Sequence, residues 1–582
     1  YLYLKIHTTA KILKFLKPFY IRMMSNSAVS VKFRWGLSAS DPEEQPALIV
    51  GQVVHLNALT WHDVRCKLEP RVTEEAWKRG LTCVSTSPGE CVELWPRGAS
   101  LASLPARRSR HAAPSRSHAL AKLVRSWNRT QREHEYVLIC RKRDVYASAM
   151  AIARCYPQYN ARSGPALLGA AADTPQARTV YVEIQLATPL FHRTIINTKQ
   201  LVIPGIFIVV PYHIFFSLEG ELEDEGVGPL DPSLLDNTLS TEELAAIQAA
   251  ADSTRLAAKI ADTPCNIMNV DKFIEEACRV AKELDLPEPT IIRGEELKAR
   301  GMGGIYGVGR AANCPPALVS LSYNVPGVEK SVAWVGKGIV YDTGGLSIKA
   351  RTSMVGMKGD CAGAAAVLGA FAAAVQAKPT VNLHAVLCLA ENAVGPDATR
   401  PDDIHQLYSG RTVEINNTDA EGRLVLSDGV VYAHRDLKAD TIVDVATLTG
   451  AQGTATGKYH AAVVSNNSSM ERRCVAAGLR AGDLAHALPF APELHFTEFS
   501  SCVADMKNSV ADRSNAQPSC AGLFILAHLG FDFPGTWLHV DMAAPAHSGE
   551  RATGYGVALL TVLFGSHTQN KLLKALSPPD AC

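Results

Sequence analysis

Short apolar runs alternate with segments whose apolar residues recur at helical spacing, and this alternation predicts an α/β protein. In the first third of the chain, strands are expected at 47–50, 136–140 and 180–186, and helices at 119–127 and 145–153. Further along, the pattern predicts helices at 241–262, 271–284 and 362–375, and strands at 290–292, 332–335, 381–390, 441–445 and 537–541. We therefore expect a smaller N-terminal α/β domain and a larger C-terminal α/β domain with a central mixed sheet flanked by helices.

The length of the chain, 582 residues, also indicates more than one domain, because it exceeds what a single hydrophobic core usually serves. The expected boundaries are an N-terminal extension at 1–40, the N-terminal domain at 41–190, an insertion and linker at 191–238, the larger domain at 239–570 and a tail at 571–582.

Two segments differ from the rest of the chain. The extension is basic and free of acidic residues, and its cations are mostly lysine, so we interpret it as a segment upstream of a start at Met23 or Met24 rather than a transit segment. The apolar run Leu201–Leu218 is interrupted by Pro204 and Pro211. We expect it to be a buried strand pair or an inserted segment, not a membrane span.

Composition limits the functional classes. Apolar residues make up 47% of the chain and charged residues 20%, as in an ordinary soluble protein. The formal charge of +1 argues against nucleic acid or an anionic membrane as a general partner. Fourteen cysteines occur without a C-x-x-C pair, which predicts reduced thiols in a cytoplasmic protein.

Candidate chemistry first appears at 416–424, where Asp419 and Glu421 precede Gly422, Arg423 and an apolar helical run. In extended backbone, side chains two residues apart point the same way, so the two carboxylates are expected to converge on a cation or a proton. Gly422 is expected to permit a sharp turn, and Arg423 to hold an anion nearby. The alternative is a solvated acidic turn.

A second group of charged residues lies upstream, at 332–360. One strand is expected to lead to Lys337, the next to Asp342 and then Lys349, and Asp360 comes directly before an Ala-rich helix. Charged residues at strand ends of an α/β sheet lie in the crevice where ligands bind. We therefore place all four in one pocket with Asp419 and Glu421.

Four carboxylates in one pocket require compensating cations. A pair of divalent metal ions about 3.5–4 Å apart would supply them. The alternative is a set of separate surface turns.

The glycines between 301 and 309 follow a helix, so they predict a structural loop rather than a phosphate-binding one.

The motifs VGKG at 335–338, YDTGGLSIK at 341–349, NTDAEGRL at 417–424, ATLTGA at 446–451 and MKN at 506–508 resemble those of the leucyl aminopeptidase family, most closely its leucyl aminopeptidase-like branch. The resemblance covers about 241–564. It departs from the family at Cys361-Ala362, where two glycines or Cys-Gly are usual, and in the insertion at 201–218.

The resemblance implies a metal-dependent aminopeptidase that removes the N-terminal residue of peptides or amino-acid amides through a water held by two metals (Zn²⁺ or Mn²⁺, with Mg²⁺ as a further candidate). It implies a cytoplasmic homo-oligomer, a hexamer. The implied metal ligands, with Asp342 and Glu421 bridging both ions, are Lys337, Asp342, Asp360, Asp419 and Glu421. Lys349 and Arg423 are the implied catalytic residues, with a bicarbonate ion at Arg423. The implied substrate-binding residues are Met357, Asn417, Thr447, Leu448 and Ala451.

Two other functions are consistent with the same residues. One is an oligomeric binding or scaffolding protein that keeps the fold with little turnover. The other is a two-metal hydrolase of phosphoesters, for which a free amine would be irrelevant.

Overall fold

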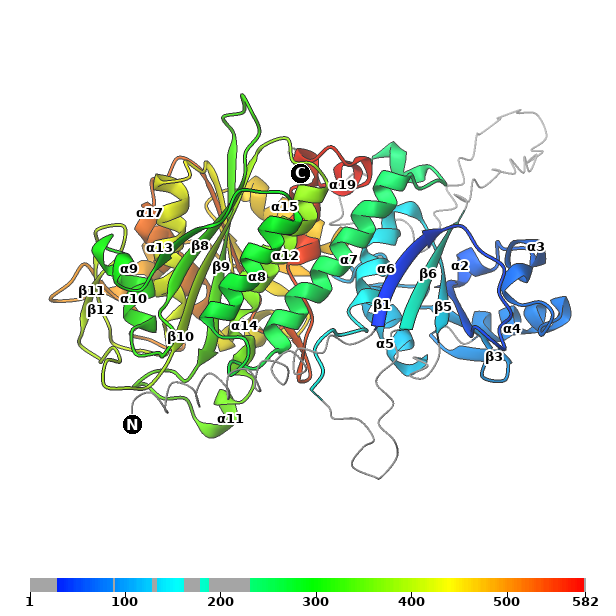
Figure 1. The fold of residues 1–582 in the computed structure, drawn as a ribbon, viewed down its shortest axis with the longest axis horizontal. Helices are drawn as coiled ribbons and strands as arrows, with labels where there is room; N and C mark the ends of the chain where they lie inside the picture. Colours follow the sequence, from blue (N-terminus) through cyan, green and yellow to red (C-terminus); the bar gives the residue numbers. More distant parts are fainter. Residues whose placement is uncertain (1–28, 87–88, 128–132, 162–177, 188–230, 580–582) are drawn as a thin grey trace, which may run out of the picture.

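The computed structural model describes residues 29–86, 89–127, 133–161, 178–187 and 231–579 (Figure 1). The basic extension up to residue 28 and the apolar run Leu201–Leu218 lie outside these residues, so the expectations for both stay predictions.

The N-terminal domain is built on one six-stranded sheet in the order β1-β6-β5-β2-β4-β3. Its neighbours are parallel except β3, which pairs antiparallel with β4 at the edge. The strands are β1 Val29–Trp35, β2 Ala47–Gln52, β3 Cys91–Trp95, β4 Ala99–Leu104, β5 His134–Cys140 and β6 Arg178–Leu186. Three helices flank it: α4 Glu74–Thr86, α5 Ser117–Trp127 and α6 Lys142–Ala153. The strands and helices predicted in this region are confirmed.

The larger domain is built on an eight-stranded sheet in the order β15-β14-β17-β13-β9-β10-β8-β7. The four pairs β15-β14, β17-β13, β13-β9 and β9-β10 are parallel, whereas β14-β17, β10-β8 and β8-β7 are antiparallel, so the sheet is mixed as predicted. The bounds are β7 Thr290–Arg293, β8 Ala317–Tyr323, β9 Ser331–Asp342, β10 Asn382–Asn392, β13 Thr441–Ala446, β14 Ala461–Ser465, β15 Ala485–Ala487 and β17 Thr536–Asp541.

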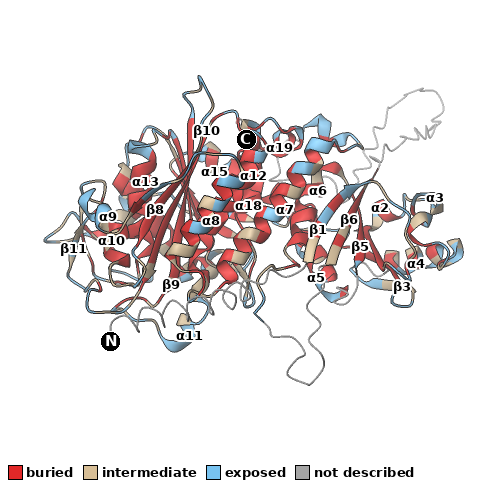
Figure 2. Ribbon diagram, in the orientation of Figure 1, coloured by how far each residue is buried: buried red, intermediate tan, exposed pale blue. Residues whose placement is uncertain are grey.

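Helices cover both faces of this sheet, and the alternation along β9 shows which face each helix covers. Val332 and Trp334 belong to one buried cluster, together with residues of α7 Thr241–Asp262, α8 Val270–Glu283, α12 Ala362–Gln376 and α18 Val557–Leu563. Ala333 and Val335 belong to another, with residues of α9 Glu295–Ala299, α10 Gly303–Gly309, α13 Gly422–Arg435 and α17 Gln517–Leu529. The strands between them are buried (Figure 2).

Helix α7 lies between the two sheets and connects the domains (Figure 1). Gln248 on α7 accepts a hydrogen bond from Phe33 N and donates one to Val31 O, both on β1. The N-terminal domain and the α7–α12 layer share one continuous hydrophobic cluster.

One described stretch, Met357–Gln376, has the length and apolar character of a membrane span, and 94% of its apolar window is buried inside the protein. It is the core helix α12 with the short turn before it, and an apolar core helix has this composition.

Two predictions of local structure are wrong. Lys337 and Asp342 do not lie on two successive strands, because β9 runs without interruption from Ser331 to Asp342. Gly336 serves close packing rather than a break, since a Cβ there would lie 2.4 Å from Ala364 Cα on α12. The glycine-rich segment after residue 301 is not a loop but contains helix α10, and a Cβ at Gly304 would lie 2.3 Å from Leu424 O on α13.

Candidate two-metal site

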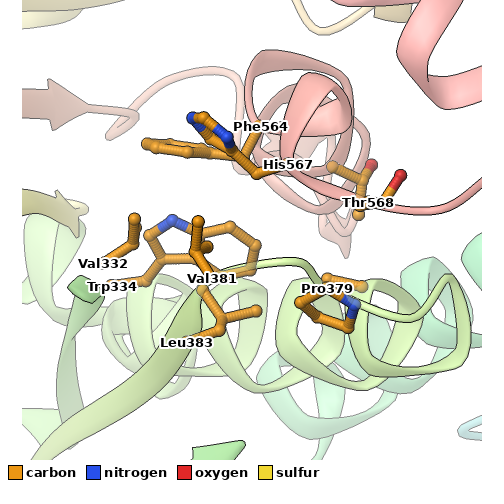
Figure 3. Close-up of a pocket in the computed structure, with 10 residues that line it drawn as sticks. Val332, Trp334, Pro379, Val381, Leu383, Phe564, His567 and Thr568 are labelled. Atoms are coloured by element: carbon orange, nitrogen blue, oxygen red, sulfur yellow. The ribbon is translucent and has the colours of Figure 1, made fainter. Parts of the chain in front are cut away.

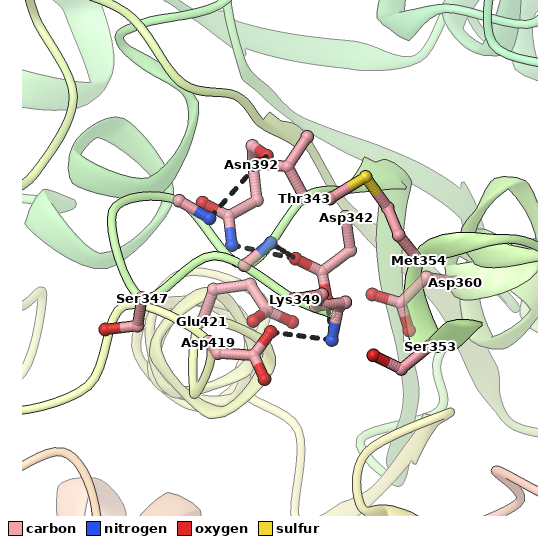
Figure 4. Close-up of polar contacts among 12 residues, drawn as sticks. Asp342, Thr343, Ser347, Lys349, Ser353, Met354, Asp360, Asn392, Asp419 and Glu421 are labelled. Carbon is pink, nitrogen blue, oxygen red and sulfur yellow. Dashed lines mark hydrogen bonds and ion pairs between the residues drawn. The ribbon is translucent and has the colours of Figure 1, made fainter. Parts of the chain in front are cut away.

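The predicted site residues meet at the carboxyl ends of the central parallel strands (Figure 4). Lys337 lies on β9 and Asp342 ends it, between β13 and β10. Asp360 lies in the short helix η4 Met357–Cys361, which leads into α12. Asp419 and Glu421 come directly before α13. The structure thus brings the upstream and downstream motifs together, as predicted, although only Asp342 is itself at the end of a strand.

Two lysine ammonium groups are shared among the four carboxylates. Lys337 Nζ lies 2.9 Å from Asp360 Oδ2 and 2.8 Å from Glu421 Oε1. Lys349 Nζ lies 2.8 Å from Asp342 Oδ2 and 2.6 Å from Asp419 Oδ1, between the two carboxylates (Figure 4). The cluster therefore holds more negative than positive charge.

The acidic groups can hold a metal ion. One carboxylate oxygen each from Asp342, Asp419 and Glu421 lies within 4.8 Å of the other two. Asp342 and Glu421 are each 2% exposed, and Glu421 Oε2 has no hydrogen-bond partner. A buried carboxylate oxygen without a donor is costly unless a cation faces it. The site residues thus fit divalent metal ions with oxygen ligands.

Burial raises the pKa values of acids in the site, whereas neighbouring negative charges raise the pKa of Lys337. Burial raises the pKa of the Asp360 carboxyl well above its usual range, and it also raises the pKa values of Asp419 and Glu421. Burial lowers the pKa of Lys337, but the charges of Asp360 and Glu421 outweigh it, so the pKa of Lys337 is raised. The acids and the lysines therefore compete for the same protons.

The local backbone differs from the prediction for 416–424. Thr418 and Asp419 form a turn, and Glu421 already has helical backbone angles (φ −75°, ψ −34°), so the two carboxylates do not converge through extended backbone. Gly422 is the first residue of α13 and is not among the glycines with positive φ, so it makes no special turn. Its role is close approach, because a Cβ there would lie 2.6 Å from Lys337 Cε.

Three polar residues that the motifs did not single out as site residues hold the ligands in place. Asn392, the last residue of β10, donates from Nδ2 to Asp342 Oδ1 at 2.8 Å and to Thr418 O at 3.1 Å. Thr418 Oγ1 donates to Gly344 O at 2.6 Å. Asn508 Oδ1 accepts from Asn416 N and Asn417 N. The strand-end rule that selected Asp342 also applies to Asn392, and was the available signal.

The remaining predicted residues surround this centre. Arg423 is buried, its Nη1 donates to Asn508 O at 3.0 Å, and burial lowers its pKa to about 10. Thr447 Oγ1 donates to Asp360 Oδ1 at 2.7 Å, and Thr447 O accepts from Lys337 Nζ at 3.0 Å. Asn417 Oδ1 accepts from Asp419 N at 3.0 Å.

Three proposed substrate residues are near the site by chain position. Met357 is in η4, three residues before Asp360, and Leu448 and Ala451 follow Thr447. All three are partly exposed, as residues that contact a substrate must be.

A small pocket at the opposite end of β9 does not belong to this centre (Figure 3). Val332, Trp334 and Leu383 line it from the sheet, and Phe564 and His567 lie across it. No acidic residue lines it.

Comparison with known proteins places these features in a family. The model of the cytosol aminopeptidase family catalytic domain matches residues 255–561, and that of the M17 aminopeptidase N-terminal domain 2 matches residues 45–165. The mouse protein named Probable aminopeptidase NPEPL1 is 51% identical over 554 residues, which cover 95% of this chain and 96% of that protein.

The chain is also similar to solved structures over most of its length. The leucine aminopeptidase of Caenorhabditis elegans is 35% identical with a TM-score of 0.80, over 94% of this chain and 100% of that one. The leucyl aminopeptidase of Trypanosoma brucei in complex with actinonin is 31% identical with a TM-score of 0.73, over 94% of this chain and 98% of that one.

Proposed function

This chain belongs to the cytosol aminopeptidase family, and we propose that it is a two-metal aminopeptidase that removes the N-terminal residue of peptides. The observation that carries the two-metal proposal is the charge of the site. Four carboxylates face only two lysine ammonium groups, and Glu421 Oε2 has no hydrogen-bond partner. Such a cluster is stable when divalent cations supply the missing positive charge.

The residues that would hold the ions are Lys337, Asp342, Asp360, Asp419 and Glu421, with Asp342 and Glu421 shared between both ions. Zn²⁺ and Mn²⁺ are the proposed metals, and Mg²⁺ is a further candidate. A lysine ligand must be neutral, and a neighbouring dication depresses its pKa enough to release the proton. When bound, two such ions supply an activated water and polarise the scissile carbonyl.

The protein's own residues would perform the remaining tasks. Lys349, 15% exposed and held by Asp342 and Asp419, is placed to stabilise the negative charge that develops on the substrate oxygen. Arg423 would hold a bicarbonate ion that moves the proton, because its Nε has no hydrogen-bond partner and the sequence motifs that supply the site residues contain no histidine for this task. Met357, Asn417, Thr447, Leu448 and Ala451 would line the pocket for the first side chain of the substrate.

Family membership also supports a cytoplasmic location and a homo-hexamer, which we include in the proposal. The cysteines among the described residues form no disulfide with one another, in keeping with a reducing compartment. We further propose 191–238 as insertion and linker, between an N-terminal domain that ends near 190 and a larger domain that begins near 239. The expected start at residue 41 is too late, because β1 Val29–Trp35 belongs to the N-terminal sheet. The expected end at residue 570 is too early, because Leu572 and Leu573 belong to the buried cluster.

Amino-acid amides test the proposal. Purified protein loaded with Mn²⁺ or Zn²⁺ is incubated with amides that carry a free α-amino group and with their N-acetylated counterparts. We expect release of ammonia from the free amines alone. Release from neither, with the metal bound, would favour the scaffolding function. Hydrolysis of phosphoesters instead would favour the phosphoesterase.

A further inference from the structure

Asp541 is a buried carboxylate that belongs to no set of candidate ligands. It is the last residue of β17 and is 0% exposed. Its Oδ1 accepts from Leu448 N at 3.1 Å and from Ala543 N at 3.2 Å. Its Oδ2 accepts from Thr449 N at 3.1 Å and from Thr449 Oγ1 at 2.6 Å. Three of these four bonds hold the turn 447–449, which follows the neighbouring strand β13.

The turn that Asp541 holds reaches two of the candidate metal ligands. Thr447 donates its hydroxyl to Asp360 Oδ1 at 2.7 Å and accepts Lys337 Nζ at its carbonyl oxygen at 3.0 Å. Thr447 is itself 9% exposed, so its side chain has little room to reorient. A displacement of the turn would move both contacts together.

The sheet register makes this connection direct. β13 and β17 are parallel, and Ala446 at the end of β13 lies opposite Asp541. The carboxylate therefore reaches from the end of one strand to the turn that leaves the next. This position requires a carboxylate, because both of its oxygens can accept hydrogen bonds. The amide of an asparagine would turn its NH₂ group toward backbone N–H donors.

We propose that Asp541 is a positioning residue of the metal centre: it holds the turn 447–449 and, through Thr447, orients Asp360 and Lys337 toward the ions. This inference rests on the proposed function, since it takes those two residues as ligands. Groups that orient metal ligands commonly change metal affinity by about 10–100-fold when they are removed.

The test is a calorimetric titration of metal-free, full-length protein with Mn²⁺. We expect Asp541→Asn and Thr447→Val each to weaken Mn²⁺ binding about tenfold or more. Thr447→Ser keeps the hydroxyl and should bind like the wild type. Both changes break the same connection. The double variant Asp541→Asn/Thr447→Val should therefore bind Mn²⁺ no more weakly than the single variant with the lower affinity.

The matched control is Asp483→Asn. Asp483 is also buried, accepts from Gly556 N at 2.9 Å and Leu559 N at 3.3 Å and forms an ion pair with Arg154, and none of these partners is a candidate ligand. The Asp483→Asn variant should have lower thermal stability and unchanged Mn²⁺ affinity. If Asp541→Asn does not fold, Thr449→Val replaces it, because this variant removes only the 2.6 Å hydroxyl bond to Oδ2 and the cap of α14 Gly450–Thr456.

Folded Asp541→Asn protein with wild-type Mn²⁺ affinity would overturn the inference. A loss of Mn²⁺ affinity in the double variant that equals the two single losses combined would also overturn it. Absence of Mn²⁺ binding in the wild type would instead refute the two-metal site itself, and the inference with it.

Discussion

Gly422 and Lys337 approach so closely that a single methyl group cannot be placed between them. A Cβ on Gly422 would lie 2.6 Å from Cε and 2.7 Å from Nζ of Lys337. The lysine cannot simply move aside, because its Nζ is held by Asp360, Glu421 and Thr447 O. The start of α13 is therefore fitted to a candidate metal ligand on β9.

Gly422→Ala is accordingly expected to weaken Mn²⁺ binding by about tenfold, although alanine normally stabilises a helix by about 1 kcal/mol relative to glycine. Gly453→Ala on α14 is the control, because its Cβ would meet only Ala544 Cβ at 3.5 Å, an ordinary contact. Calorimetry on both variants measures the difference. Equal Mn²⁺ affinities would show that the close approach has no role in the centre.

The bridging position assigned to Glu421 predicts that metal and activity are lost together. Glu421→Ala should reduce bound metal below that of the wild type and abolish amide hydrolysis, and Asp419→Ala should act in the same direction. Metal content by atomic emission, read beside initial rates, checks this. Glu414→Ala removes a nearby carboxylate that bonds Ser501 and should change neither quantity. Full metal content in an inactive Glu421→Ala enzyme would refute the ligand assignment.

The two lysines are predicted to differ in kind. Lys349→Ala should retain the metal and lower kcat by about 10²–10³-fold, because it removes a preorganised charge rather than a ligand. Lys337→Ala should lose metal instead. Each variant is the control for the other, measured by metal content and by kcat at saturating substrate. If Lys349→Ala lost the metal while retaining kcat on reloading, the roles would have to be exchanged.

Asp428 provides a prediction about pH and stability. It is fully buried on α13, it accepts from Ile305 N at 2.9 Å and Tyr408 N at 2.8 Å, and burial raises its pKa to about 7. The folded protein therefore binds a proton there that the unfolded chain releases near its ordinary pKa. This contribution to stability is complete at low pH and is lost as the pH rises through about 7.

Asp428→Asn cannot titrate, so the stability of the wild type relative to this variant should fall between about pH 4 and pH 7, by at most about 4 kcal/mol. Urea unfolding of both proteins across this range measures the difference. A difference that stays constant with pH would show that Asp428 does not change its charge there.

The sequence could predict that the charged residues of the motifs share one pocket. The crevice rule for α/β sheets predicts a common pocket for Lys337, Asp342, Asp360, Asp419 and Glu421, and the structure brings them together. Only Asp342 is itself at a strand end, so the rule gives the pocket but not the element that carries each residue. The buried strands and the amphipathic helices could be predicted for a different reason, namely regular apolar spacing.

What the sequence could not predict depends on close contacts between distant segments. The sequence predicts a strand that stops at residue 335, but Gly336 admits Ala364 of α12 against a continuous β9. The glycines of α10 looked like a loop, but they admit α13 and neighbouring backbone. Asn392 and Asp541 each end a strand, which is the one signal the sequence offers for them, but the groups that they hold follow only from the hydrogen bonds that they make.

The most direct test of the two-metal site is an anomalous diffraction map of crystals grown with Mn²⁺. The account predicts two anomalous peaks per chain, both bordered by Asp342 and Glu421, one also by Asp360 and Lys337 and the other by Asp419. A map with no peak among these residues, in protein that hydrolyses free-amine amides at full rate, would contradict it.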